Sequence, residues 1–271
     1  MEPPVRPRVL EHDIAGEGDP LILVPGGLTG WVSWIPHQDH LSTRRRVIRV
    51  QPIHNELGSA GKPGDPGYTR QIERESLRLT LDELDIEQGD FAGWSGGGKA
   101  LIDFTVAHGD RVRSLTLVEP AAYWILEKLG EMSPELDEFI RYLYSFSGQA
   151  VTEDNLAVFL SKAGFVVDSS QARDHPFWER AMPHMATLSW LSESLMSSDA
   201  AIEDLSRIEC PTLLTKGTTT EPWEKRVVDL LGEYLPNSGV VELQGGHAHH
   251  IESIDPFLEE LEKHLTTVRT R

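Results

Sequence analysis

Short apolar runs alternate with longer amphipathic stretches along most of this chain. The apolar runs predict β-strands at 21–24, 47–50, 90–94, 113–118, 211–215 and 239–243. Between them, apolar side chains recur at helical spacing, as at Leu77, Leu81 and Leu84, which predicts helices at 69–84, 99–108, 224–235 and 256–265. This alternation is typical of an α/β fold with a mostly parallel central sheet flanked by helices.

The strand pattern disappears between residues 121 and 204, where amphipathic segments at 134–146 and 153–163 take its place. We therefore expect a core domain formed by residues 1–120 and 205–271, and a helical cap, or lid, formed by residues 121–204. The segment after residue 50 is rich in Gly and Pro as far as Gly67, and we expect it to be a loop.

The composition restricts the classes of partner. Hydrophobic residues make up 39% of the chain and charged residues 25%, as in globular proteins, and the formal net charge is −18. This charge repels phosphate backbones and anionic lipids, so we expect no nucleic-acid or membrane partner. The N-terminal segment has no apolar core of a signal peptide, and no apolar run approaches the roughly 18 residues of a membrane span, so we expect a cytoplasmic protein. The single cysteine, Cys210, cannot form an internal disulfide and is expected to be a small buried side chain.

A candidate nucleophile follows the predicted strand 90–94. The sequence Gly93-Trp94-Ser95-Gly96-Gly97 matches the pattern G-x-S-x-G, in which small neighbours tolerate a strained turn that presents the serine hydroxyl. The alternative is a glycine-rich turn that only connects a strand to a helix. We expect Gly96, at the helix start, to donate one backbone N–H to an oxyanion, and Gly27, in the loop after strand 21–24, to donate a second.

Three histidines compete for the role of the base. His247 follows Gly245 and Gly246 directly, which leaves it room to reach Ser95, and it is our first choice; His249 and His250 are the alternatives. The same cluster could indicate zinc, but three ligands within four residues strain a tetrahedral site, and we expect no metal and no cofactor.

Two carboxylates are candidates to orient the histidine. Glu119 directly follows the apolar strand 113–118, at a carboxyl strand end where reactive groups of parallel sheets gather, and burying its charge there requires a partner. Glu221 lies in the loop after strand 211–215. We prefer Glu119; the alternative for both is an ordinary carboxylate at a helix N-terminus.

Four motifs in the order Val-Pro-Gly-Gly, Gly-Trp-Ser-Gly-Gly, Val-Glu-Pro and Gly-Gly-His resemble the α/β-hydrolase superfamily. Within it, Pro25, the Glu directly after the strand before the lid and the segment 175–180 are similar to fungal zearalenone-lactone hydrolases. The resemblance implies an α/β-hydrolase fold with the lid inserted after the sixth strand. It also implies a triad and an oxyanion hole, with a lid side chain against the substrate; the residues concerned are Ser95, Glu119, His247, Gly27, Gly96 and Trp178. Thr220 stands where the common pattern has the acid.

Aromatic residues of the loops and the lid are expected to form the substrate pocket, with Tyr123, Trp124 and Trp178 as its walls and Trp34 as core packing. We expect a serine hydrolase that cleaves a small carboxylic ester or lactone with an apolar or aromatic group, through an acyl-enzyme on Ser95. The same fold could instead support carbon–carbon bond hydrolysis, cofactor-free oxygenation, a lyase step or ligand reception, and a homodimer is left open.

Overall fold

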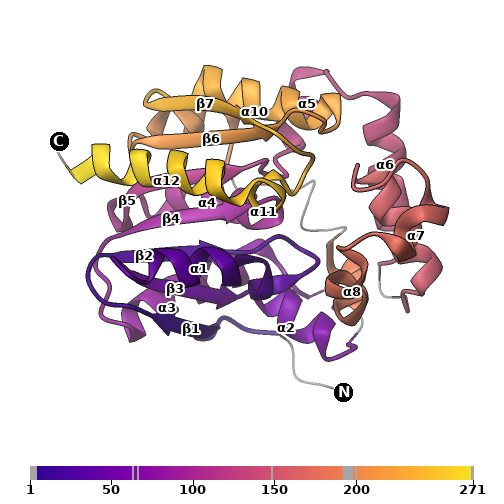
Figure 1. Cartoon of the computed structure of the whole chain (residues 1–271), viewed down its shortest axis with the longest axis horizontal. Helices are drawn as coiled ribbons and strands as arrows, with labels where there is room; N and C mark the ends of the chain where they lie inside the picture. The colour runs from indigo at the N-terminus through magenta and orange to yellow at the C-terminus, as the bar shows by residue number, and fades with distance from the viewer. Residues whose placement is uncertain are drawn as a thin grey trace.

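A seven-stranded sheet forms the centre of the protein (Figure 1). The computed structural model describes residues 5–62, 64–65, 67–147, 149–191, 198 and 200–269. The strand order is β1-β3-β2-β4-β5-β6-β7; β1 is antiparallel to β3, and every other neighbouring pair is parallel. The strands are β1 (Glu11–Ala15), β2 (Pro20–Val24), β3 (Arg46–Gln51), β4 (Gly89–Trp94), β5 (Val112–Val118), β6 (Thr212–Gly217) and β7 (Ser238–Leu243).

Helices cover the sheet because its central strands are apolar on both faces. All six residues of β4 are buried, as are six of the seven residues of β5. In Figure 1, α1 (Ile35–Leu41) and α12 (Ile254–Arg269) lie in front of the sheet. Helix α4 (Gly96–Ala107) packs on β4 and β5, and α3 (Arg70–Glu83) lies beside it. Helix α10 (Pro222–Tyr234) packs on β6 and β7. The predicted α/β class with a mostly parallel sheet is confirmed.

Two short segments in the N-terminal part of the chain differ from the sequence-based expectation. The edge strand β1 was not predicted, because its sequence EHDIA is polar and mostly exposed and shows no apolar run. The predicted loop between residue 50 and Gly67 begins with a helix, α2 (Ile53–Ser59), which starts directly after Pro52. Its inward side chains include His54 and Asn55, so its buried face is not apolar and gave no helical signal.

Helical elements fill the chain between β5 and β6. They are α5 (Trp124–Leu129), α6 (Pro134–Tyr144), α7 (Glu153–Lys162), η3 (Ser169–Asp174), α8 (Trp178–Ala181), η4 (Met182–Thr187) and η5 (Ile202–Arg207), and Figure 1 shows α6, α7 and α8 together at one end of the sheet. This insertion follows the fifth strand, not the sixth, because a single antiparallel strand precedes β2 among the described residues. The domain boundaries at 121 and 204 stay a prediction, and residues 192–197 and 199 lie outside the described chain.

The remaining elements complete the core. They are η1 (Gly30–Trp34) before α1, η2 (Gly109–Arg111) before β5 and α11 (His249–Glu252) before α12. Cys210 is half-buried against the core, and burial raises the pKa of its thiol to about 11, so it stays protonated and is a poor nucleophile. Within the described residues, no helix combines the length and the apolar character needed to cross a membrane.

Gly97 allows α4 to start close beneath the loop after β2, and its replacement tests this approach. A Cβ on Gly97 would lie 2.3 Å from the carbonyl oxygen of Pro25 and 2.5 Å from that of Val24, whereas a Cβ on Gly109 would meet nothing within 4 Å. We expect Gly97→Ala to lower the free energy of unfolding by about 1–3 kcal/mol, because backbone atoms must move. Gly109→Ala should change it by less than about 0.5 kcal/mol. Chemical denaturation measures both; equal stabilities would contradict the predicted clash.

Candidate active site

Ser95 occupies a strained turn between β4 and α4. Its backbone has φ 51° and ψ −118°, a region that residues with a side chain rarely adopt. The turn is held by neighbouring strands: Ser95 N donates to Val118 O at 2.9 Å, and Ser95 O accepts from Ala121 N at 3.0 Å. Such strain costs about 1–3 kcal/mol and persists because the surrounding structure enforces it. The half-buried side chain of Ser95 lines a cavity, as the G-x-S-x-G motif predicts.

Two backbone segments meet beside Ser95. A Cβ on Gly96 would lie 3.5 Å from Gly27 N, so the loop after β2 and the start of α4 are adjacent, and both glycines line the same cavity. Gly96 is the first residue of α4, where a backbone N–H has no carbonyl partner one turn earlier. The buried amide of Asn55 donates to Gly27 O at 2.8 Å and fixes this loop. The arrangement is suited to hold an oxyanion.

His247 lies in the loop between β7 and α11. Its main-chain oxygen accepts a hydrogen bond from the indole of Trp94 at 2.9 Å, which anchors the loop next to the turn at Ser95. The end of β6 lies very close to this loop, since a Cβ on Gly217 would lie 2.4 Å from Gly245 O. This close approach requires a glycine at 217.

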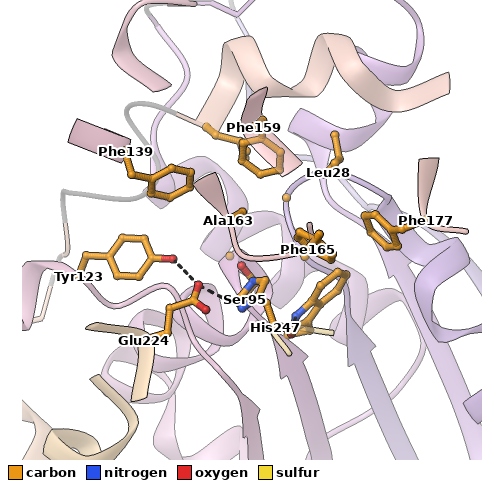
Figure 2. Close-up of a pocket in the computed structure, with 15 residues that line it drawn as sticks. Leu28, Ser95, Tyr123, Phe139, Phe159, Ala163, Phe165, Phe177, Glu224 and His247 are labelled. Carbon is orange, nitrogen blue, oxygen red and sulfur yellow. Dashed lines mark hydrogen bonds and ion pairs between the residues drawn. The ribbon is translucent and has the colours of Figure 1, made fainter. Parts of the chain in front are cut away.

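Ser95 and His247 line the same cavity, where Figure 2 shows them close together, below Phe139 and Phe159. A hydrogen bond from Ser95 Oγ to the His247 ring is not among the contacts of the described residues. The contact for proton transfer therefore has to form by rotation of the serine side chain, as is common in active sites without a substrate.

Glu119 holds the other side of the His247 ring. His247 Nδ1 donates to Glu119 Oε2 at 2.8 Å, and Glu119 Oε1 accepts from Gly217 N at 2.6 Å. Glu119 also has a positive φ of 38°, which turns its side chain away from the path of β5. Burial works to raise the pKa of Glu119, but the hydrogen bond and charge of His247, together with His249 and Gly217 N–H, lower it. Glu119 is thus held as a buried anion.

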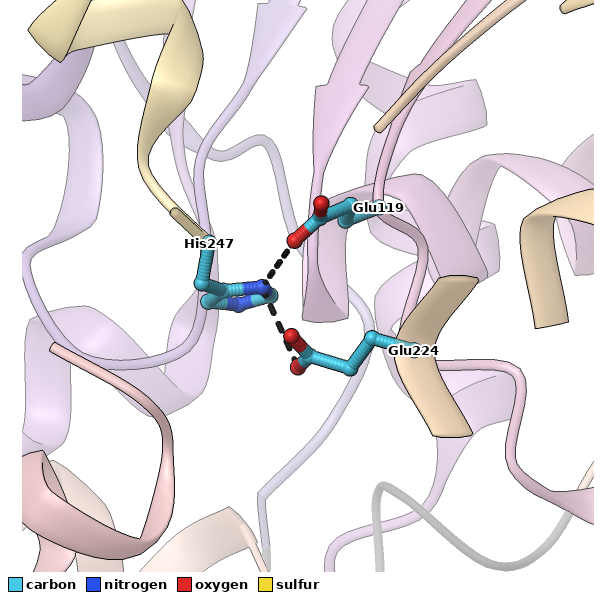
Figure 3. Close-up of side chains that lie close together, drawn as sticks. All are labelled: Glu119, Glu224 and His247. Atoms are coloured by element: carbon cyan, nitrogen blue, oxygen red, sulfur yellow. Dashed lines mark hydrogen bonds and ion pairs between the residues drawn. The ribbon is translucent and has the colours of Figure 1, made fainter. Parts of the chain in front are cut away.

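A second carboxylate, Glu224 in the first turn of α10, approaches the same ring nitrogen as Glu119 (Figure 3). Its Oε1 is 3.1 Å from His247 Nδ1 and accepts from the Tyr123 hydroxyl at 3.2 Å. Thr220 Oγ1 bridges the two acids, at 2.8 Å from Glu119 Oε2 and 2.9 Å from Glu224 Oε2. Burial tends to lower the pKa of His247, but the charge of Glu224 and the hydrogen bond of Glu119 raise it to about 10.

Sequence reasoning missed Glu224 and named Glu221 instead. Glu221 is the N-cap residue of α10 and lies beside Gly164, away from the described contacts of His247. A signal was present: Glu224, Val227, Val228 and Leu231 are spaced i, i+3, i+4 and i+7, so Glu224 lies on the apolar, buried face of its helix. A carboxylate on such a face requires polar partners.

The other two histidines have structural surroundings. His249 Nε2 lies 2.9 Å from Thr215 Oγ1 and its Nδ1 3.1 Å from Gly246 O. His250 packs against Trp34 and Trp94 and stacks on His37, and burial lowers its pKa well below the usual value. Neither ring lines the cavity that contains Ser95. The predicted packing role of Trp34 agrees with its full burial.

The three neighbouring histidines do not converge in a way that could bind zinc. The ligand atoms that do converge among the described side chains are those of Glu119, Glu224 and His247, within 4.8 Å of one another. These atoms hydrogen bond to each other and to Thr220, Tyr123 and Gly217, which satisfies them without an ion.

The cavity above Ser95 is mostly apolar and has no Lys or Arg in its described lining. It encloses about 500 Å³ including its open mouth, and its lining residues are Gly26, Gly27, Leu28, Trp94, Ser95, Gly96, Tyr123, Phe139, Phe159, Ala163, Phe165, Phe177, Leu191, Glu224 and His247. Tyr123 is a wall of the cavity, as predicted. The structure places Trp124 in the core at 1% exposure, and Trp178 beneath the guanidinium of Arg173, outside the lining, because the first turns of α5 and α8 point these side chains elsewhere.

Comparisons with known proteins agree with this fold. No family model matches the chain. The 2-hydroxymuconate semialdehyde hydrolase of Pseudomonas sp. (strain CF600) is 33% identical over 155 residues, 54% of this chain and 54% of that protein, so the match spans about half the relative's length. The pimeloyl-acyl-carrier protein methyl ester esterase of Aeromonas hydrophila is 24% identical over 250 residues, 91% of this chain and 95% of that protein. A solved meta-cleavage product hydrolase from Pseudomonas fluorescens IP01 has a TM-score of 0.73 and 19% identity, over 95% of this chain and 94% of that one.

The chain has the α/β-hydrolase fold, the fold of the solved structures that it resembles. The matched relatives are named hydrolases and esterases, and the expected enzyme class, a hydrolase, is confirmed at this level. The narrower resemblance to zearalenone-lactone hydrolases is not tested by these comparisons and stays a prediction.

Replacing Glu119 and Glu221 separately tests which of these two glutamates orients His247. We expect Glu119→Gln to reduce kcat by about 10³–10⁴-fold, because the amide no longer fixes the Nδ1–H tautomer of His247 or stabilises its cation. Glu221→Gln should stay within about twofold of the unchanged protein, since Glu221 does not contact the ring. Steady-state hydrolysis of an activated ester measures both; a larger loss for Glu221→Gln would contradict the assignment.

Proposed function

We propose that the protein is a serine hydrolase that cleaves a neutral carboxylic ester or lactone with an apolar or aromatic group. The observation that carries this proposal is the strained turn that presents Ser95 in the cavity of His247, whose Nδ1 is held by a buried Glu119. Such an arrangement of nucleophile, base and orienting acid serves acyl transfer in unrelated folds.

The proposed reaction has two stages. His247 Nε2 takes the proton of Ser95 as its Oγ attacks the substrate carbonyl, and Glu119 stabilises the resulting imidazolium through Nδ1. The backbone N–H groups of Gly27 and Gly96 hold the oxyanion. The imidazolium then protonates the leaving alkoxide, which leaves an acyl ester on Ser95. Water, deprotonated by His247, attacks this ester, releases the acid and restores the hydroxyl.

The lining of the cavity favours an uncharged substrate. Four phenylalanine rings, Phe139, Phe159, Phe165 and Phe177, form much of its wall, and Phe165 and Phe177 stack at 4.6 Å. The titratable groups in the described lining are Tyr123, Glu224 and His247, so a substrate carboxylate would be buried there without a Lys or Arg to pair with.

A second candidate is hydrolysis of a carbon–carbon bond. The matched hydrolase of Pseudomonas sp. (strain CF600) is named for the substrate 2-hydroxymuconate semialdehyde. Muconate-type compounds carry a carboxylate, however, and the described lining offers no Lys or Arg to bind one. We therefore propose ester or lactone cleavage as the function and treat the carbon–carbon reaction as the alternative that the substrate test must separate.

Replacement of the proposed nucleophile tests the mechanism. We expect Ser95→Ala to lower the hydrolysis of a 4-nitrophenyl ester by at least about 10⁴-fold and to abolish labelling by a fluorophosphonate. Mass spectrometry should find the adduct of the unchanged protein on the peptide that contains Ser95. Cys210→Ser, which alters the one cysteine, is the control and should retain both. Undiminished turnover by Ser95→Ala would refute the proposed function.

Substrate charge tests the proposed specificity. A neutral aryl ester and the same ester carrying a remote carboxylate should differ in kcat/KM by at least about 100-fold in favour of the neutral compound, because an unpaired charge would be buried among phenylalanine rings. Carbon–carbon cleavage is tested with two vinylogous diketones, one neutral and one carrying a carboxylate, by analysing the products of each. Preference for the carboxylate-bearing diketone would favour the alternative reaction.

A further inference from the structure

A shared hydroxyl limits the charge that this site can carry. Thr220 Oγ1 lies 2.8 Å from Glu119 Oε2 and 2.9 Å from Glu224 Oε2, and both contacts have hydrogen-bond geometry. A threonine hydroxyl has one proton, so it can donate to one of these oxygens but not to both. The second contact is a hydrogen bond only if the carboxyl group there carries its own proton and donates it to Thr220. One of the two glutamates is therefore a neutral carboxylic acid.

The other contacts identify which one. Glu119 receives the Nδ1–H of His247 at 2.8 Å and the N–H of Gly217 at 2.6 Å, short bonds that suit an anion. Glu224 Oε1 has longer contacts, 3.2 Å to Tyr123 and 3.1 Å to Nδ1, and the residue is only 3% exposed. One set of protons satisfies the hydrogen bonds of Thr220: Glu224 Oε2–H donates to Thr220, and Thr220 donates to Glu119 Oε2. Tyr123 donates to Glu224 Oε1, and the single Nδ1 proton of His247 is donated to the nearer acceptor, Glu119 Oε2.

We propose that Glu224 is a positioning residue that acts as a neutral carboxylic acid, joining Tyr123, Thr220 and Glu119 in one chain of hydrogen bonds beside His247. This inference rests on the proposed function for its catalytic meaning, since it concerns the base of that reaction. Its structural content, a proton on Glu224 in the resting protein, does not depend on any substrate.

The proton on Glu224 keeps His247 usable as a base. With both glutamates ionised, their charges raise the pKa of His247 to about 10, and the ring would stay protonated at neutral pH, unable to accept the Ser95 proton. Burial raises the pKa of Glu224, which favours its neutral form and leaves one anion at Nδ1. The titratable groups that face this pair are Tyr123, Glu119, His247 and, 3.7 Å from Glu119, His249.

The chain of hydrogen bonds also explains Thr220, which stands where the sequence pattern led us to expect the acid. The carboxyl group of Glu224 reaches back from one turn later in the chain and, through the Thr220 hydroxyl, supports the acid supplied by β5. The site therefore contains carboxyl groups from both possible strand ends, one charged and one neutral.

Infrared difference spectroscopy on the resting protein at neutral pH tests the proton directly. The spectrum of the unchanged protein minus that of Glu224→Gln should contain the C=O stretch of a protonated carboxyl group, and the matched difference with Glu221→Gln, three residues earlier, should not. Thr220→Val should shift this band, because the proton loses its acceptor. A band that is absent at neutral pH, or is present equally in the Glu221→Gln difference, would overturn the proposal. No substrate is needed, so the result stands even if the proposed esterase function fails.

The pH dependence of kcat/KM tests the electrostatic consequence. The rate should rise as pH increases through the pKa of the base, since only the neutral ring accepts a proton. A glutamine at 224 can donate to Thr220 and accept from Tyr123 as a neutral acid does. We therefore expect Glu224→Gln to keep the midpoint of this rise within about 0.3 pH unit of the unchanged protein. Glu224→Leu, which can make neither hydrogen bond, should lower kcat/KM by about tenfold or more. Glu224→Gln should avoid most of that loss.

Two outcomes of these assays would contradict a neutral Glu224. If the residue is an anion, removing its charge in Glu224→Gln should lower the midpoint of the rise by about one pH unit or more. If instead Glu119, Glu224 and His247 bind a metal, the unchanged protein should bind Zn²⁺ stoichiometrically and Glu224→Gln should not. A stable midpoint together with the infrared band supports the proposal.

Discussion

The hydrogen bond between His247 Nδ1 and Glu119 Oε2 is the contact on which the rest of the site depends. It joins groups 128 residues apart in the chain, and both are nearly excluded from water. The sheet brings the two residues together, because β5, β6 and β7 are parallel neighbours whose carboxyl ends meet at one edge. A buried carboxylate without this partner would be costly, so the fold and the site stabilise one another.

The strands also determine where the nucleophile can lie. Ser95 and Glu119 follow adjacent strands, β4 and β5, and both have positive φ angles. The two strained turns are tied together, since Ser95 N bonds to Val118 O and Ser95 O receives Ala121 N. Backbone strain at both residues is thereby supported by the hydrogen bonds of the same pair of strands, and it directs both side chains toward the cavity edge.

Enclosure by the helices after β5 gives the cavity its electrostatic character. Phe139 and Phe159 come from α6 and α7, and they face a polar wall formed by Ser95, Glu224 and His247. In such surroundings each buried charge strongly affects its neighbours, so the number of charges around His247 matters more than the number of acidic residues. A pair of glutamates that share the hydroxyl of Thr220 can carry one negative charge while both remain hydrogen bonded.

The sequence by itself determined the features that depend on a few neighbouring residues. The apolar runs predicted the parallel strands, and the small residues around Ser95 predicted its strained turn, because steric exclusion in a turn acts over a few residues. The preference for Glu119 also followed from its place after an apolar strand. The edge strand β1 was missed because pairing with β3, not an apolar pattern, makes it a strand. Only the tertiary structure decided that Glu224 joins His247, that Trp124 is core and that Trp178 lies outside the cavity. These outcomes depend on how helices rotate and pack against distant segments, and local sequence does not specify that geometry.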